Sequence, residues 1–225
     1  MAENAIDLVG ASRSFGERIA LDRLDLQVPT GTRLAVLGAN GAGKTTLLRL
    51  LCGLLRPHEG EVSVLGKRLP REAWAIRGKV GLLAHEPMLY RALTVRENLT
   101  HQARLLRVAG ERVPELIERV GISTRADEPI RNLSRGTIQR AAAARAVLAD
   151  PALLLLDEPY ANLDPGGTAT ISPLLEEGRT IVISGHEPRV LLERSDMALG
   201  LRDGRAVFLK PSAEVSDTEI AGLYG

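Results

Sequence analysis

The sequence contains a single cysteine, and this scarcity excludes any disulfide framework within the chain. Cys52 lies among leucines, so we expect a small buried apolar side chain rather than a reactive thiol. A chain without internal disulfides agrees with a reducing compartment such as the cytosol.

Long apolar segments are missing too. No uninterrupted apolar run approaches the ~20 residues that a membrane-spanning helix requires. The first residues, Met1 to Asn4, lack the basic segment followed by an apolar one that marks a secretion signal. We therefore expect that the chain neither spans a membrane nor enters a secretion route by itself.

An excess of positive charge is also absent. The 29 lysines and arginines nearly balance the 28 aspartates and glutamates, for a net charge of +1. Proteins that bind nucleic acid by neutralising phosphates carry a broad basic field, so nucleic acid is a poor candidate partner. Only four of the cations are lysines, and one of them is Lys44. We interpret most of the arginines as solvated surface.

The chain does have the length and apolar content for one substantial α/β core. Its 225 residues are 44% hydrophobic and 25% charged, without an internal repeat, a low-complexity tract or a linker. We expect one domain over residues 1–225. Within it, residues 1–85 and 151–225 are predicted to form the core with a β layer, and residues 86–150 a helical subdomain.

The strand pattern predicts two sheets. Apolar or alternating segments at residues 6–9 and 21–28, bounded by glycine, serine and proline, indicate an N-terminal antiparallel layer. Shorter strands are expected at residues 33–37, 61–65 and 80–83. Residues 152–156 and 180–184 are apolar on both faces, as in the central strands of a parallel sheet covered by helices.

From residue 94 to about residue 149 the pattern is helical. Thr94 is a candidate N-cap, and Glu97 three residues later predicts a capping box. Another helix is expected to begin near Ser134 and to end at Asp150-Pro151, because proline cannot continue it. These helices predict a helical insert within the α/β fold.

A glycine-rich loop joins the strand at residues 33–37 to a helical stretch at residues 44–55. It fits the phosphate-binding pattern of a glycine, four residues and Gly-Lys-Thr, with the residues Gly38, Ala39, Asn40, Gly41, Ala42, Gly43, Lys44, Thr45 and Thr46. Glycines let successive backbone N–H groups point at phosphate oxygens, and the helix N-terminus adds its positive dipole end. The strand and helix context disfavours an incidental glycine-rich turn.

The chemistry of the same loop predicts its ligands. Lys44 can reach the β- and γ-phosphates of ATP as a point charge, and the Thr45 hydroxyl can ligate the Mg²⁺ that accompanies the nucleotide. The fold prediction is therefore an α/β P-loop NTPase with a parallel-sheet core, an N-terminal antiparallel β layer and a helical insert subdomain.

Two carboxylates follow the apolar strand at residues 152–156. They lie at the C-terminal edge of the predicted sheet, where open α/β folds bind ligands. Asp157 is predicted to join the Mg²⁺ shell, and Glu158 to polarise the water that attacks the γ-phosphate. Adjacent acids are common on protein surfaces, and it is the run of leucines before them that favours a site.

Nearly the whole chain resembles the ATP-binding subunit of ABC transporters, because its motifs occur in that family's order. The segment from Asn132 to Arg140 is similar to the signature motif, usually Leu-Ser-Gly-Gly-Gln, with Ser134, Arg135 and Gly136 at its centre. The resemblance implies that Ser134 and Gly136, at a helix N-terminus, meet a phosphate of ATP held by the opposite subunit.

Three more positions match the family individually. Asp164, after Ala161-Asn162-Leu163, resembles the D-loop residue at the dimer interface. His186 resembles the switch histidine that contacts the γ-phosphate, and Phe15 matches the aromatic residue that stacks on adenine. Taken singly, Ser134 is better explained as an N-cap, His186 as a capping or surface histidine and Phe15 as a core aromatic, and it is their shared order that favours function.

The sequence also departs from the family pattern in three places. His85 stands where a glutamine usually senses Mg²⁺ and links the site to the helical insert, although a neutral imidazole can still accept from a metal-bound water or bind the metal. Arg135 and Thr137 replace the usual glycine and glutamine of the signature. The stretch from residue 164 to residue 178 is short and contains Pro173, which predicts a truncated or offset helix.

The resemblance implies an ATPase that powers an ABC transporter from the cytoplasmic face of the cell membrane. Two ATP molecules would lie between two chains, the second being another copy of this one, and hydrolysis would let the chains separate. An integral membrane subunit is expected to dock around residues 85–108.

The cargo is a finer hypothesis. The segment from His85 to Tyr90, together with Ser134-Arg135-Gly136, is similar to the ATP-binding subunits of haem exporters in cytochrome c biogenesis. Exporters of drugs, lipids or polysaccharides are alternatives, because fold resemblance does not determine substrate. Soluble ABC-type ATPases that act on ribosomes or DNA are an alternative of another class, but they usually carry two nucleotide domains or coiled-coil inserts. A P-loop kinase is a further alternative, but it would lack the signature helix.

Overall fold

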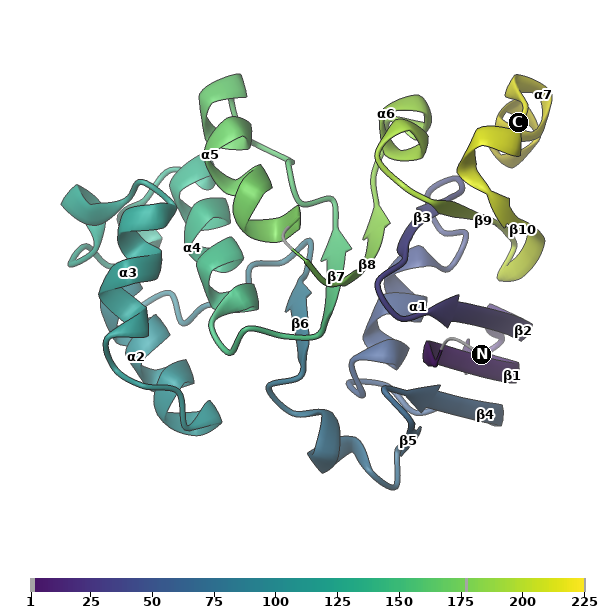
Figure 1. Ribbon diagram of the computed structural model, residues 1–225, viewed down its shortest axis with the longest axis horizontal. Helices are drawn as coiled ribbons and strands as arrows, with labels where there is room; N and C mark the ends of the chain where they lie inside the picture. The colour runs from purple at the N-terminus through teal and green to yellow at the C-terminus, as the bar shows by residue number, and fades with distance from the viewer. Residues whose placement is uncertain (1–2, 177, 225) are drawn as a thin grey trace.

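The computed structural model describes residues 3–176 and 178–224. The fold is built on two β-sheets (Figure 1). The N-terminal sheet is antiparallel, in the order β2-β1-β4-β5. Its strands are β1 Asn4–Phe15, β2 Arg18–Pro29, β4 Glu59–Val64 and β5 Lys67–Leu69. This confirms the predicted antiparallel layer, with longer strands than the pattern indicated because β1 and β2 continue through irregular register shifts.

The second sheet has the order β10-β9-β3-β8-β7-β6, and its strands are parallel except for β10, which pairs with β9 in a hairpin. They are β3 Arg33–Leu37, β6 Val80–Leu83, β7 Leu153–Asp157, β8 Thr180–Ser184, β9 Met197–Arg202 and β10 Arg205–Pro211. The predicted parallel-sheet core is confirmed. The carboxyl ends of β6, β7 and β8 therefore lie side by side at one edge.

Strand β7, which lies between β8 and the edge strand β6, is buried along its whole length because each of its faces supports a different core. Leu153 and Leu155 belong to a cluster with α1 Lys44–Leu51 and the N-terminal sheet. Leu154 and Leu156 belong to a second cluster with the helices on the other side. Alternation of side chains along a strand divides the four leucines in this way.

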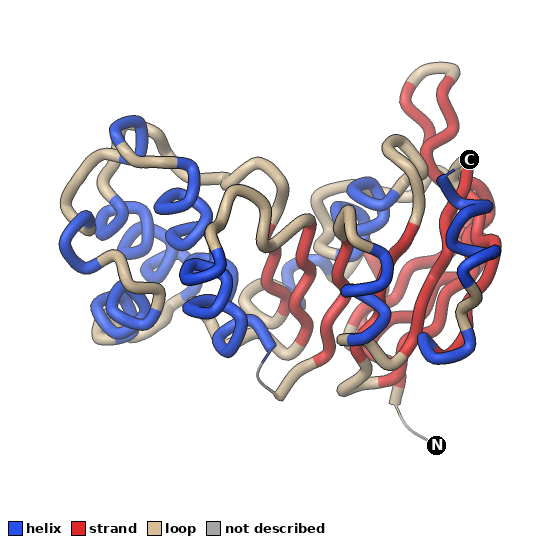
Figure 2. The backbone as a smooth tube through the Cα atoms, turned by 90° about the horizontal axis from the view of Figure 1, so that it is seen from above, coloured by secondary structure: helices blue, strands red, loops and turns tan. Residues whose placement is uncertain are grey.

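The helices on that other side form the insert expected from the sequence. They are α2 Val95–Leu106, α3 Arg112–Arg119 and α4 Arg135–Val147, with short 3₁₀ turns between them. Figure 1 shows them at the end of the molecule opposite the N-terminal sheet, and Figure 2 shows the same separation from above. The chain continues into α5 Pro165–Glu176, α6 Pro188–Glu193 and α7 Asp217–Tyr224.

Local capping chemistry begins both predicted insert helices where the sequence placed them. The Glu97 backbone N–H donates to Thr94 Oγ1 at 3.1 Å, and the Thr94 N–H donates to Glu97 Oε2 at 2.8 Å, which forms the capping box. Ser134 caps α4 by accepting from the N–H of Thr137 at 3.2 Å.

Two local predictions were wrong in detail. Helix α1 ends at Leu51 rather than at residue 55, because the chain turns at Gly53 with a left-handed φ of 75°. Cys52, at that end, is partly rather than fully buried, and this burial raises the pKa of its thiol. Its sulfur donates to the Arg49 carbonyl at 3.3 Å.

The C-terminal helix α7 reaches the glycine-rich loop. Lys210 Nζ donates to both carboxylate oxygens of Glu219, at 2.7 and 2.8 Å, and Ser216 adds donors from its backbone and hydroxyl. These hydrogen bonds lower the pKa of Glu219 to about 2. At the end of α7 the Tyr224 hydroxyl accepts from the N–H of Gly38 at 3.3 Å.

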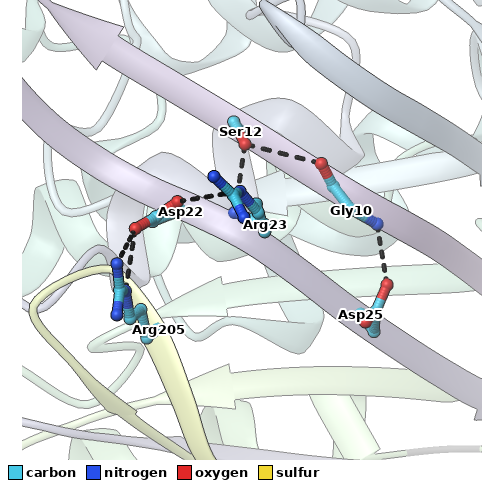
Figure 3. Close-up of polar contacts among 6 residues, drawn as sticks. All are labelled: Gly10, Ser12, Asp22, Arg23, Asp25 and Arg205. Carbon is cyan, nitrogen blue, oxygen red and sulfur yellow. Dashed lines mark hydrogen bonds and ion pairs between the residues drawn. The ribbon is translucent and has the colours of Figure 1, made fainter.

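Polar contacts also join the β9–β10 hairpin to the N-terminal sheet (Figure 3). Arg205 Nε donates to Asp22 Oδ2 at 2.8 Å, from β10 to β2. The N–H of Asp22 donates to the carbonyl of Gly204 at 2.9 Å, and the N–H of Gly204 donates to the carbonyl of Ala42 at 3.1 Å. The hairpin thus links the N-terminal sheet to the glycine-rich loop.

In the described part of the chain, every helix is too short or too polar to cross a membrane.

Candidate nucleotide site

The glycine-rich loop connects β3 to α1, and its backbone requires glycine. Gly38, Gly41 and Gly43 have φ values of 146°, 87° and 109°, which disfavour residues with a Cβ. A Cβ on Gly43 would lie 2.5 Å from the carbonyl oxygen of Ala20, closer than van der Waals contact permits. The N–H groups of Gly38 and Ala42 already donate to Tyr224 and Ala39, and the loop keeps a conformation that leaves other N–H groups available to an anion.

Lys44 begins α1 and is 8% exposed, so its ammonium lies inside the loop. Its Nζ donates to the carbonyl of Gly38 at 2.6 Å and to that of Ala39 at 3.0 Å. Burial lowers the pKa of Lys44, and the negative charges of Glu158 and Asp157 oppose that shift. Phosphate oxygens are stronger acceptors than these carbonyls and can replace them.

The two predicted Mg²⁺ ligands contact each other. Thr45 Oγ1 donates to Asp157 Oδ2 at 2.8 Å, although 112 residues separate them in the sequence. Ser184 donates to the other oxygen, Oδ1, at 2.6 Å. A hydroxyl and a carboxylate are hard oxygen donors of the kind that Mg²⁺ prefers. Sequence analysis did not identify Ser184 as a site residue. Its position beside Asp157 follows from the parallel register of β7 and β8, which pairs the two residues.

Glu158 lies between two histidines, directly after β7. His186 Nε2, two residues after β8, is 2.6 Å from Glu158 Oε1, and His85 Nδ1, two residues after β6, is 3.2 Å from Oε2. The carboxylate side chain is only 15% exposed. Glu158 has a left-handed φ of 54°, a conformation that is uncommon for residues with a Cβ and that recurs at functional sites. The structure thus brings both predicted catalytic residues together.

A cavity of about 330 Å³ lies over the loop, and most of the predicted nucleotide and metal residues line it, whereas Gly38, Ala39, Ala42 and His85 are not among its walls. Its walls are Phe15, Arg18, Ala20, Asn40, Gly41, Gly43, Lys44, Thr45, Thr46, Asp157 and Glu158. Phe15 is 47% exposed, and the guanidinium of Arg13 lies 4.8 Å from its ring centroid. A flat exposed ring at this wall suits stacking on a purine base.

Arg18 is a lining residue that sequence reasoning missed. Its Nη2 donates to the carbonyl of Gly41 at 3.3 Å, which brings a second cation to the phosphate loop. The available signal was its place three residues after Phe15, at the start of β2.

The signature residues lie elsewhere. Ser134 and Arg135 are exposed at the N-terminus of α4, and among the described residues that line the 330 Å³ cavity neither they nor Gly136 occur. Helix α4 is joined to the catalytic segment by Gln139 Nε2, which donates to the carbonyl of Pro159 at 2.8 Å. Asp164, the predicted interface residue, lies 3.7 Å from the guanidinium of Arg140 on the same helix.

A second, mainly apolar cavity of about 200 Å³ adjoins Glu158 between α5 and α6, with Ile181, Ile183, Val190 and Leu191 among its walls. Helix α5 continues three residues past Pro173 to Glu176. There Tyr160 donates to Glu176 Oε1 at 2.9 Å, and burial raises the pKa of the tyrosine.

Comparison with known proteins places these features in one family. Residues 21–161 match the ABC transporter family. The chain is 38% identical over 239 residues to the phosphonates import ATP-binding protein PhnC of Anaeromyxobacter dehalogenans, covering 98% of this chain and 48% of that protein. It is 40% identical over 192 residues to the daunorubicin resistance ATP-binding protein DrrA3 of Streptomyces coeruleorubidus, covering 82% and 61%.

A solved structure agrees. The ATP-binding cassette MJ0796, in a dimeric post-hydrolysis state bound to ADP and Pi, superposes with a TM-score of 0.84 and 26% identity, covering 92% of this chain and 98% of that one. The chain spans about half to three-fifths of the length of the two curated relatives.

Proposed function

The chain belongs to the ABC transporter family, and we propose that it is an ATP-binding subunit that hydrolyses ATP with Mg²⁺ to power a transporter. One observation carries the proposal. The Thr45–Asp157 and Glu158–His186 contacts converge on the phosphate loop from strands that are distant in the sequence. A kinase of the same loop class would account for the loop but not for this pairing or for the signature helix.

In the proposed mechanism, backbone N–H groups of the loop other than those of Gly38 and Ala42, together with the Lys44 ammonium, bind the phosphates. Thr45 and Asp157 would hold Mg²⁺, which when bound neutralises charge that develops on the phosphates. Glu158 orients the attacking water and accepts its proton at a carboxylate oxygen. His186 holds that carboxylate through the 2.6 Å contact.

We propose further that the signature of one chain serves the ATP of another. The support is geometric, since Ser134 is an exposed helix cap outside the cavity of its own chain. A helix N-terminus that presents a hydroxyl and backbone N–H groups binds phosphate well. The similar cassette MJ0796 forms a dimer, and a site shared between two chains requires a dimer.

Complementation between two inactive variants tests this arrangement. Ser134→Asp keeps a good N-cap but sets a negative charge against phosphate, and Lys44→Ala disables the loop. Each variant alone should be inactive. An equal mixture should recover up to about a quarter of the wild-type rate, because half of the dimers are mixed and each holds one intact site of two.

The measurement is steady-state phosphate release. Ser134→Thr, which keeps both the hydroxyl and the cap, is the matched control and should stay active. If the signature acts on the ATP of its own chain, the mixture will be no faster than either variant alone.

We propose an integral membrane subunit as the partner, docked around residues 85–108, where a helical subdomain (residues 86–150) begins within one domain that spans residues 1–225. Met88, Tyr90 and Leu105 support this proposal, because they are 49%, 60% and 60% exposed and apolar. The chain would then lie peripherally on the cytoplasmic face of the membrane.

Affinity purification from native membranes should recover a polytopic membrane protein with the wild-type chain. The double variant Met88→Asp, Tyr90→Asp should lose that protein while its ATP hydrolysis in isolation is retained. Ribosomes or DNA in place of a membrane protein would instead support the soluble ATPases of the same family.

For cargo we propose haem export in cytochrome c biogenesis, supported by the segment from His85 to Tyr90 and by the Ser134-Arg135-Gly136 variant of the signature. The names of the two curated relatives concern phosphonate import and daunorubicin resistance, so the hypothesis rests on these short variants alone. Reconstituted with its partner, the chain should hydrolyse ATP faster when haem is present. If a drug, lipid or polysaccharide stimulated ATP hydrolysis and haem did not, that compound would replace haem as the proposed cargo.

A further inference from the structure

Three parallel strands end beside one another and place His85, Glu158 and His186 in a row. Strands β6, β7 and β8 pair in register, with Leu83 opposite Leu156 and Asp157 opposite Ser184. Each of the three side chains follows the end of its own strand by one or two residues. Glu158 is the central member, and each of its carboxylate oxygens faces a different imidazole.

The two contacts are not equivalent in their chemistry. His186 approaches through Nε2 at 2.6 Å, and His85 approaches through Nδ1 at 3.2 Å. An ionised carboxylate only accepts hydrogen bonds, so an imidazole nitrogen at these distances attracts it only when that nitrogen carries a proton. In a neutral His85, this requirement leaves Nε2 as a lone pair directed away from Glu158.

We propose that His85 is a positioning residue for Glu158, acting through Nδ1, in addition to any contact of its Nε2 with the nucleotide site. The proposal rests on Glu158 orienting the attacking water. A carboxylate held at one oxygen can still rotate about its last bond, whereas contacts at both oxygens fix the plane of the group. Displacement of a catalytic group by about 1 Å can cost on the order of 100-fold in rate.

The contact lies where the chain leaves the sheet for the insert. The residues that follow His85 lead through Tyr90 and the Thr94 cap into α2, the first helix of the insert. The Tyr90 N–H donates to Asn98 Oδ1 at 2.8 Å, and Asn98 Nδ2 returns a hydrogen bond to the Tyr90 carbonyl at 3.1 Å, so this segment is attached to α2.

Two amide substitutions separate this role from a contact made only through Nε2. The amide nitrogen of asparagine lies one bond beyond Cγ, as Nδ1 does, whereas that of glutamine lies one bond further out, near the place of Nε2. His85→Asn should therefore keep the contact with Glu158 and stay within about threefold of the wild-type kcat. His85→Gln and His85→Ala should lose this contact, and their kcat should fall by about tenfold or more.

Steady-state kinetics and ATP titration are measured for all four proteins. The positioning role predicts that the change falls on kcat, with the ATP dissociation constant within about twofold in every variant. The Asn and Gln variants are matched controls, because both replace a ring by an amide at the same site.

The opposite order, with His85→Gln active and His85→Asn impaired, would overturn the inference and assign the residue to an Nε2 contact. Equal activity of all three variants would overturn it as well. A wild-type chain without ATPase activity would instead contradict the proposed function itself, so the two failures are distinguishable.

Discussion

Glu158→Gln should lower steady-state ATP hydrolysis by about 100-fold to 10,000-fold, the range that general-base catalysis contributes. The amide has nearly the shape of the carboxylate but cannot accept a proton from the attacking water. The phosphate loop is untouched, so ATP should still bind, and an ATP-dependent dimer should accumulate because hydrolysis no longer releases it.

Phosphate release measures the rate, and size-exclusion chromatography with and without ATP measures the dimer. Glu118→Gln is the matched control, since it removes the same charge from an exposed position on α3, and it should behave as the wild type. Unchanged turnover of a monomeric Glu158→Gln protein would show that this carboxylate is not the base.

Lys44→Ala should raise the ATP dissociation constant by about 10-fold to 100-fold, because a charge-assisted hydrogen bond contributes about 1.5–3 kcal/mol. Lys44 is 8% exposed and is the only loop side chain that carries a positive charge. Its substitution also frees the carbonyls of Gly38 and Ala39 from their present donor, which loosens the loop around the phosphates.

Calorimetric titration with ATP and Mg²⁺ measures the constant. Lys79→Ala is the matched control, because Lys79 is exposed just before β6, outside the nucleotide cavity. Circular dichroism of both variants checks that they are folded. An unaltered ATP dissociation constant in a folded Lys44→Ala protein would contradict the assignment of the loop.

Features that depend on a few neighbouring residues could be predicted from the sequence. The Thr94–Glu97 capping box and the Ser134 cap each involve partners three residues apart, so both depend only on residues that are close in the sequence. The same holds for the phosphate loop, whose glycines and lysine lie within nine residues of sequence. The four leucines before Asp157 predicted a buried strand because both of its faces needed apolar partners.

Strand and helix limits were less predictable. The β1 and β2 strands extend beyond their apolar segments because pairing continues through bulges over polar residues. Helix α1 stopped earlier than its apolar pattern indicated, because one glycine adopted a left-handed conformation that the pattern does not encode.

The sequence by itself predicted the proposed ATP chemistry, since the loop, the paired acids and the signature are each patterns of contiguous residues. Only the tertiary structure decided which of these groups meet. The parallel register of β6, β7 and β8 places His85 and His186 on either side of Glu158 and sets Ser184 against Asp157. Register between strands separated by a helical insert depends on how the whole sheet packs, and no short stretch of sequence specifies it.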